Sequence, residues 1–159
     1  IIPESKLNQL IEMLFKGLVM QLTNQPVDLK IEEWIYNEYP GLREFQEISF
    51  QSQLQEALGG LTEDVRKITP YKIYEASHSM NYTYFNVLAK NTKFDLDSAY
   101  DNFEFEVKGK LLIEIIEKYE NNLDGDIKRI NDWANILNLS EWYEWKNFED
   151  VPSNYGAII

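Results

Sequence analysis

The chain has 159 residues, of which 27 are Asp or Glu, 15 are Lys or Arg, one is His and none is Cys, so its formal net charge is -12. The missing Cys excludes disulfides, thiol nucleophiles and Cys-ligated metal centres, and the single His excludes any site built on two imidazoles. The negative charge argues against direct binding of nucleic acid, which requires a positive surface. This length suffices for one hydrophobic core, so we expect one helical domain over residues 1–159.

Hydrophobic residues make up 44% of the chain and aromatic residues 14%, which is too apolar for a disordered segment despite the charge. No apolar run approaches the ~20 residues of a membrane span, and the start lacks the basic and apolar regions of a signal peptide. We therefore expect a soluble, cytoplasmic protein without membrane partners. The chain starts at Ile1 rather than Met, and its apolar ends favour a segment trimmed or excised from a longer protein.

The N-terminal third shows helical periodicity. Over residues 7–22 Leu and Ile recur every three or four positions, and Asn24 with Pro26 is predicted to end this helix. Gly17 inside it costs ~1 kcal/mol relative to Ala, so we expect another helix to approach closely there. Further helices are predicted over residues 28–39, over residues 42–58 and from a Thr62 cap onward. In the first of these, Ile31, Trp34 and Ile35 are expected to face inward.

The middle of the chain is ambiguous. Residues 70–90 have apolar residues that can share one helical face, but the stretch is also rich in Tyr, Thr, Val and Phe, which suit strands. Phe103, Phe105 and Val107 alternate with Glu, which is a period of two. We favour a helix for residues 70–90, and residues 100–108 remain open between helix and strand.

The C-terminal third again shows helical spacing. Helices are predicted over residues 111–119, over residues 126–138 with Asp126 as the N-cap, and over residues 141–148 with Ser140 as the N-cap, before an extended tail over residues 151–159. The predicted fold is mainly α, a compact bundle of about six to eight helices. The alternative is an α+β fold with a small sheet within residues 71–107.

Two motifs resemble metal sites only in part. Glu75 and His78 match the Glu-x-x-His spacing of helical di-iron proteins, which need a second such pair that this chain lacks. His78 is therefore interpreted as a surface or core-edge residue. Residues 95–101 resemble the front of a calcium loop but lack its Gly at the sixth position, so they are interpreted as a capping loop. No catalytic residue, metal or cofactor is predicted.

Aromatic residues between Trp133 and Tyr155 alternate with acids. In a helix over residues 141–148, Trp142 and Trp145 share one face, but together with Tyr143 they span most of the circumference, so at least one is exposed. Aromatic anchors among charges are typical of recognition surfaces. The predicted partner-binding residues are Trp142, Trp145, Tyr143, Glu141, Glu144, Glu149 and Asp150. The competing interpretation is that this helix closes the core.

Three functional hypotheses follow from these observations. The first is an acidic protein-binding module, a stoichiometric inhibitor comparable with bacterial immunity proteins, which occludes a basic partner such as a toxin nuclease; its acids would mimic phosphates and speed association. The second is a regulatory or structural helical domain of a larger protein. The third is a carboxylate- and Mg²⁺-dependent enzyme, which would show several Asp or Glu converging in one pocket with raised pKa values.

Overall fold

The computed structural model describes residues 3–96 and 103–151, and these residues form six α-helices and two short 3₁₀ turns without any strand. The elements are α1 (Glu4–Glu38), η1 (Pro40–Leu42), α2 (Arg43–Gly59), α3 (Glu63–Ile68), α4 (Tyr71–Thr92), α5 (Phe103–Ile116), α6 (Leu123–Ile136) and η3 (Phe148–Asp150). The prediction of a mainly α bundle is confirmed. The alternative sheet within residues 71–107 is wrong for the described part of that range, which is helical except at the end of α4.

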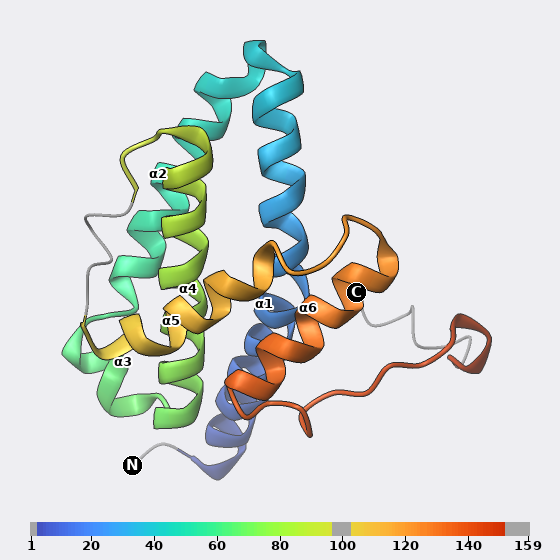
Figure 1. The fold of residues 1–159 in the computed structure, drawn as a ribbon. Helices are drawn as coiled ribbons and strands as arrows, with labels where there is room; N and C mark the ends of the chain where they lie inside the picture. Colours follow the sequence, from blue (N-terminus) through green and yellow to red (C-terminus); the bar gives the residue numbers. More distant parts are fainter. Residues whose placement is uncertain (1–2, 97–102, 152–159) are drawn as a thin grey trace.

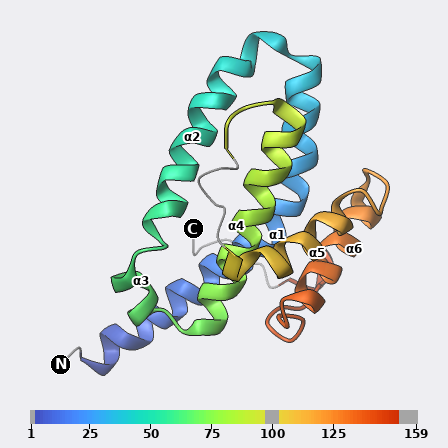
Figure 2. The same cartoon turned by 60° about the vertical axis from the view of Figure 1, so that its left-hand side comes forward.

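The central element is α4, which packs along α1 and against α5. The pair α5 and α6 crosses α1 and α4 on one side, and α2 with α3 lies on the opposite side (Figures 1 and 2). This position explains the ambiguous composition of α4. Four of its five Tyr and Phe residues are buried against neighbours on several sides, namely Tyr74, Tyr82, Tyr84 and Phe85. Burial among helices, rather than a place in a sheet, accounts for these aromatic residues.

The first two predicted helices are one continuous helix, α1, which runs through Pro26. Proline lacks an N–H and so removes one backbone hydrogen bond from the helix. Pro26 is nevertheless buried together with Leu22 and Leu29, and this packing offsets the loss. The predicted break at Asn24 and Pro26 is therefore wrong, because tertiary packing outweighs the local preference.

The inward face of α1 also differs from the prediction. Leu22 and Leu29 set the buried side of the continuous helix, and Ile31 and Trp34 lie on its opposite side with 46% and 54% of their surface exposed. The expectation that Ile31 and Trp34 face the core is therefore wrong, and only Ile35 is partly buried.

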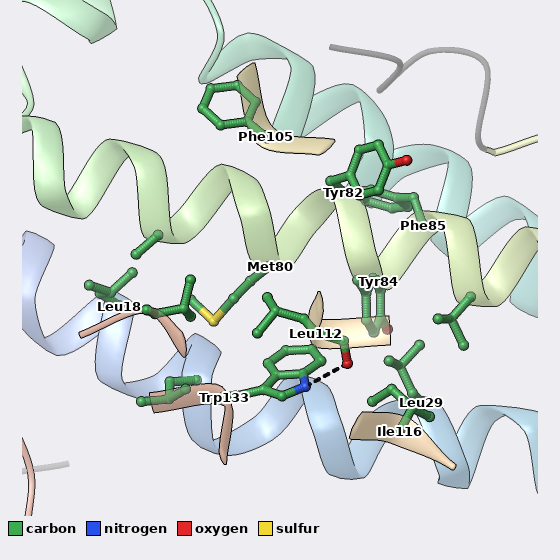
Figure 3. Close-up of a cluster of buried hydrophobic side chains, with 14 of the residues drawn as sticks. Leu18, Leu29, Met80, Tyr82, Tyr84, Phe85, Phe105, Leu112, Ile116 and Trp133 are labelled. Carbon is green, nitrogen blue, oxygen red and sulfur yellow. Dashed lines mark hydrogen bonds between the residues drawn. The ribbon is translucent and has the colours of Figure 1, made fainter. Parts of the chain in front are cut away.

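The core is a single cluster contributed by α1, α2, α4, α5 and α6 together with Leu96 and the residues that follow α6. Trp133 of α6 is fully buried in it, and its indole N–H donates to the backbone oxygen of Leu112 at 3.1 Å (Figure 3). Buried indole groups usually need such a partner. Trp133 therefore fixes α6 against α5 through both packing and one directed bond.

Close helix approach occurs at Gly109 rather than at Gly17. A Cβ atom at Gly109 would lie 2.2 Å from the ring of Tyr82, and the backbone oxygen of Gly109 accepts a bond from Thr83 Oγ1 at 3.0 Å. A Cβ atom at Gly17 would meet nothing within 4 Å. The expected packing reason for Gly17 is therefore wrong, and it is Gly109 that lets α5 lie directly on α4.

The predicted caps are only partly right. The N-cap of α6 is Asn122, whose Oδ1 accepts from the Gly125 N–H at 2.9 Å, so the helix begins before the predicted Asp126. Thr62 precedes α3 as predicted, but its hydroxyl donates back to the Gly59 oxygen at 3.2 Å instead of accepting from the first turn. None of the described helices is long and apolar enough to cross a membrane.

His78 lies in the core with 5% of its surface exposed. Its ring packs against Tyr74 and Phe105 at centroid distances of 4.4 and 5.2 Å, and Nε2 lies 3.2 Å from the Gly60 oxygen. Burial lowers the pKa of His78 to about 4, while the Gly60 oxygen opposes this shift. His78 is therefore a neutral residue of the core that borders a hollow, so of the two predicted positions the surface is wrong and the edge of the core is the one that fits.

This burial predicts a pH dependence of stability. Between pH 6.5 and about 4 the unfolded chain binds a proton on His78 that the folded chain does not, so the free energy of unfolding falls as the pH falls through this window. We expect a loss of roughly 2 kcal/mol, less than the full shift implies because the ring borders a hollow that water can enter. Denaturant unfolding of the wild type and of His78→Gln from pH 7 to 4.5 measures this loss of unfolding free energy. The variant shares all the carboxylates, so equal slopes against pH in both proteins would refute the assignment.

Candidate protein-interaction surface

The segment that follows α6 leaves the helix through a Schellman motif. Asn138 adopts a left-handed conformation with φ of 57°, its N–H donates to the Asn135 oxygen at 3.2 Å, and the Leu139 N–H donates to the Ala134 oxygen at 2.7 Å. Leu139 is then buried in the core. This motif satisfies the last carbonyls of α6 and turns the chain out of the helix direction.

Residues 140–147 form turns and extended chain, so the predicted helix over residues 141–148 is wrong. Ser140 does not act as an N-cap; its hydroxyl donates to Asn135 Oδ1 at 2.5 Å. A helix of this length is marginal unless tertiary contacts favour it. Here the aromatic side chains instead contact two different helices, α1 and α6. Extended chain can direct neighbouring side chains to both helices, whereas a single helical turn cannot. The tail beyond Val151 lies outside the described residues.

Trp142 is an anchor of this segment. It is half-buried, its ring stacks on Phe15 of α1 at a centroid distance of 5.4 Å, and the Lys72 ammonium lies 4.9 Å from its ring centroid. Much of the indole surface is therefore occupied by contacts within the chain. The expectation that Trp142 and Trp145 share one helical face is wrong.

Asn131 of α6 holds the next part of the segment. Its Oδ1 accepts from the Tyr143 hydroxyl at 2.8 Å and from the Trp145 indole N–H at 2.9 Å. The two rings pack edge to face at 5.7 Å. One side-chain oxygen thus fixes the orientation of both aromatic rings, which limits the entropy they lose when a partner binds.

Beyond this anchor the apolar side chains are exposed. Trp145 is 49% exposed, Phe148 93% and Leu123, at the start of α6, 74%. They border a hollow of about 630 Å³ lined also by Ile127, Lys146, Asn147 and Asp150. In Figure 1 the segment that follows α6 runs away from α2 and α4, past the outer side of α6. We call Leu123, Ile127, Trp145 and Phe148 the C-terminal apolar surface.

Acidic groups surround this surface. Glu141, Glu144, Glu149 and Asp150 are all exposed. The basic residue of the segment, Lys146, pairs with Glu144 at 2.9 Å. The segment therefore presents aromatic side chains within a negative field.

The structure brings together Tyr143, Trp145 and the acids of the segment, and it places Trp142 apart from them against α1. Sequence reasoning missed Leu123, Ile127 and Asn131. These three residues are spaced four apart, which places them on one face of α6. This spacing is the sequence signal that could have indicated a shared surface.

The described carboxylates do not form a metal site. No group of three or more His, Asp or Glu within residues 3–96 and 103–151 could hold a metal ion. Burial, and then the neighbouring Glu32, raise the pKa of Asp28, which is one carboxylate rather than a set converging in a pocket. Most of the calcium-like loop, residues 97–101, lies outside the described part of the chain.

Comparison of the chain with protein-family models, with curated proteins and with solved structures finds no match.

Proposed function

We propose that this chain is an acidic protein-binding module, a stoichiometric inhibitor of immunity type that occludes a basic partner with its C-terminal apolar surface. The observation that carries the proposal is the combination of exposed Trp145 and Phe148 with four exposed acids on one short segment. Large aromatic side chains at the centre and charges at the rim are the composition of energetically important interfaces.

The sign of the charge selects the class of partner. The chain carries -12 overall, and residues 139–151 contain four acids and one base. Opposite charges accelerate encounter and exclude acidic competitors. A nuclease with a positive cleft is such a partner, and the inhibitor would act by covering that cleft without chemistry of its own.

The proposal is tested by capture at low salt. The immobilised chain is exposed to an extract of the source cells at about 50 mM salt, and bound proteins are eluted by raising the salt. We expect a basic protein that elutes with salt, forms a one-to-one complex and loses its activity in that complex. We further expect affinity to fall about tenfold or more between 50 and 300 mM salt. Retention of acidic proteins only, or affinity independent of salt, would contradict the proposal.

A second candidate is a structural or regulatory domain of a larger protein. It is favoured by apolar side chains that remain exposed around the α1–α2 turn, namely Tyr39, Leu42, Phe45 and Ile48. Such a surface is a place for another domain to pack. The capture experiment separates the two candidates, because only the inhibitor requires a basic protein released by salt.

A further inference from the structure

Two adjoining hollows lie between α1, α2 and α4, well apart in sequence from the C-terminal apolar surface. Their volumes are about 370 and 250 Å³, and they share Gln21, Glu56, Ala57 and Asn81 as lining residues. The larger one extends to α3 and α4. We call the two together the α1–α2 groove.

The amide side chains of this groove have a determined orientation. The backbone oxygen of Ser77 can only accept, and it accepts from Gln21 Nε2 at 3.1 Å. The same nitrogen donates to Asn81 Oδ1 at 2.7 Å, so Asn81 presents its oxygen. Gln25 then must present its nitrogen to Asn81 Oδ1, at 3.1 Å. Gln25 lines the smaller hollow, and its Oε1 atom is consequently an acceptor that is buried without a hydrogen-bond partner among the described residues.

The charge of the groove has one sign. Glu56 lines both hollows, is exposed, and takes part in none of the ion pairs found among the described residues. Among the residues that the structure describes, neither hollow is lined by a Lys or Arg. His78 borders the larger hollow and stays neutral near pH 7 because it is buried. An anion would therefore meet no counter-charge among these residues, whereas a cation meets the Glu56 carboxylate.

The remaining wall is apolar. Leu14, Leu18 and Ile73 line the larger hollow, and Gly17 leaves it open on the α1 side, because a Cβ atom there would meet nothing within 4 Å. Apolar walls beside a charged end suit the methylene stem and charged head of a long cation.

We propose that the α1–α2 groove binds an organic cation, an alkylammonium or alkylguanidinium group whose methylenes lie along Leu14, Leu18 and Ile73 and whose head lies at Glu56. A metal ion does not suit the groove, because no group of three or more His, Asp or Glu among the described residues could hold one. The cation belongs either to a Lys or Arg side chain of another protein or to a free small molecule. This site is separate from the C-terminal apolar surface, so each proposal can fail without the other.

The experiment titrates the chain calorimetrically with N-acetyl-arginine N-methylamide, with agmatine, and with the matching citrulline derivative, which replaces the guanidinium by a neutral urea. We expect the arginine derivative or agmatine to bind, and the citrulline derivative to bind about tenfold more weakly or not at all. Binding of the arginine derivative alone assigns the cation to a protein side chain, and binding of agmatine at equal or higher affinity assigns it to a free molecule. No binding of either at 10 mM, or equal binding of citrulline, overturns the proposal.

Variants locate the site. Glu56→Gln is expected to weaken binding about fivefold or more, while Glu47→Gln removes the same charge from an exposed position of the same helix outside the groove and should change nothing. Gly17→Leu fills the larger hollow and should abolish binding, with Gly17→Ala as the control for folding. Thermal unfolding of each variant confirms that it is folded. Binding unaffected by both Glu56→Gln and Gly17→Leu would overturn the assignment.

Discussion

Replacing Arg129 with methionine is expected to lower the free energy of unfolding by about 3 kcal/mol, because it leaves the buried Ile116 oxygen and the partly buried Asp126 carboxylate without a donor. Arg129 is completely buried on α6. Its Nε donates to the Ile116 oxygen at 2.9 Å, and its Nη2 donates to the Tyr119 oxygen and to Asn121 Oδ1. Its Nη1 bonds Asp126 at 2.9 Å. The guanidinium thus caps the C-terminal end of α5 and holds the α5–α6 loop.

Denaturant unfolding followed by circular dichroism measures this loss. Arg129→Lys keeps the charge but not the planar set of donors, so it should recover only part of the stability. Lys128→Met, at the exposed neighbouring position, removes the same charge and should cost less than about 0.5 kcal/mol. A loss below 1 kcal/mol for Arg129→Met would show that the α5–α6 loop does not depend on this side chain.

Replacing both Trp145 and Phe148 with alanine is expected to weaken binding of the basic partner by about 4 kcal/mol, roughly a thousandfold, with about 2 kcal/mol from each side chain if the two act independently. Phe148 is almost fully exposed and Trp145 about half exposed, so the helical core should not suffer, although the bond from Trp145 to Asn131 is lost. Trp142→Ala should behave differently. Because Trp142 packs on Phe15 and beneath Lys72, its loss should lower the melting temperature as well as any affinity.

Titration of the purified partner into each variant measures the affinity, and thermal unfolding of the same variants measures the stability. The matched control is Trp34→Ala, which removes a tryptophan of similar exposure from the C-terminal part of α1. It should leave affinity unchanged. If the Trp145 and Phe148 double variant bound as tightly as wild type, the C-terminal apolar surface would not be the binding surface.

Local spacing was a good guide where a helix has one apolar face and clear end signals. The prediction of residues 42–58 agrees with α2 to within a residue at each end, because Pro40-Gly41 and Gly59-Gly60 mark its limits. The helix predicted over residues 70–90 also agrees with α4, although its composition was ambiguous because α4 is buried on several sides. Asn138 also ends α6 as expected, since Asn tolerates the left-handed conformation it adopts there.

The candidate surface was predicted in composition but not in geometry. Exposure of Trp145 beside acids agrees with the expectation that at least one aromatic residue of the segment is exposed. The helix predicted over residues 141–148 does not form, because Trp142 contacts α1 and Trp145 bonds Asn131 on α6. Contacts between residues so distant in sequence leave no periodic signal.

By itself the sequence determined the helical class, the net charge of -12 and the exclusion of Cys chemistry and of two-imidazole sites, since these follow from composition and short-range spacing. Only the tertiary structure decided that α1 continues through Pro26, that Arg129 is buried and that His78 is neutral. Packing outweighs the cost of about 3 kcal/mol for a proline inside a helix. The burial of Arg129 and His78 depends on contacts with other elements and loops. Contacts between residues distant in sequence also position Trp145 on α6 and form the α1–α2 groove.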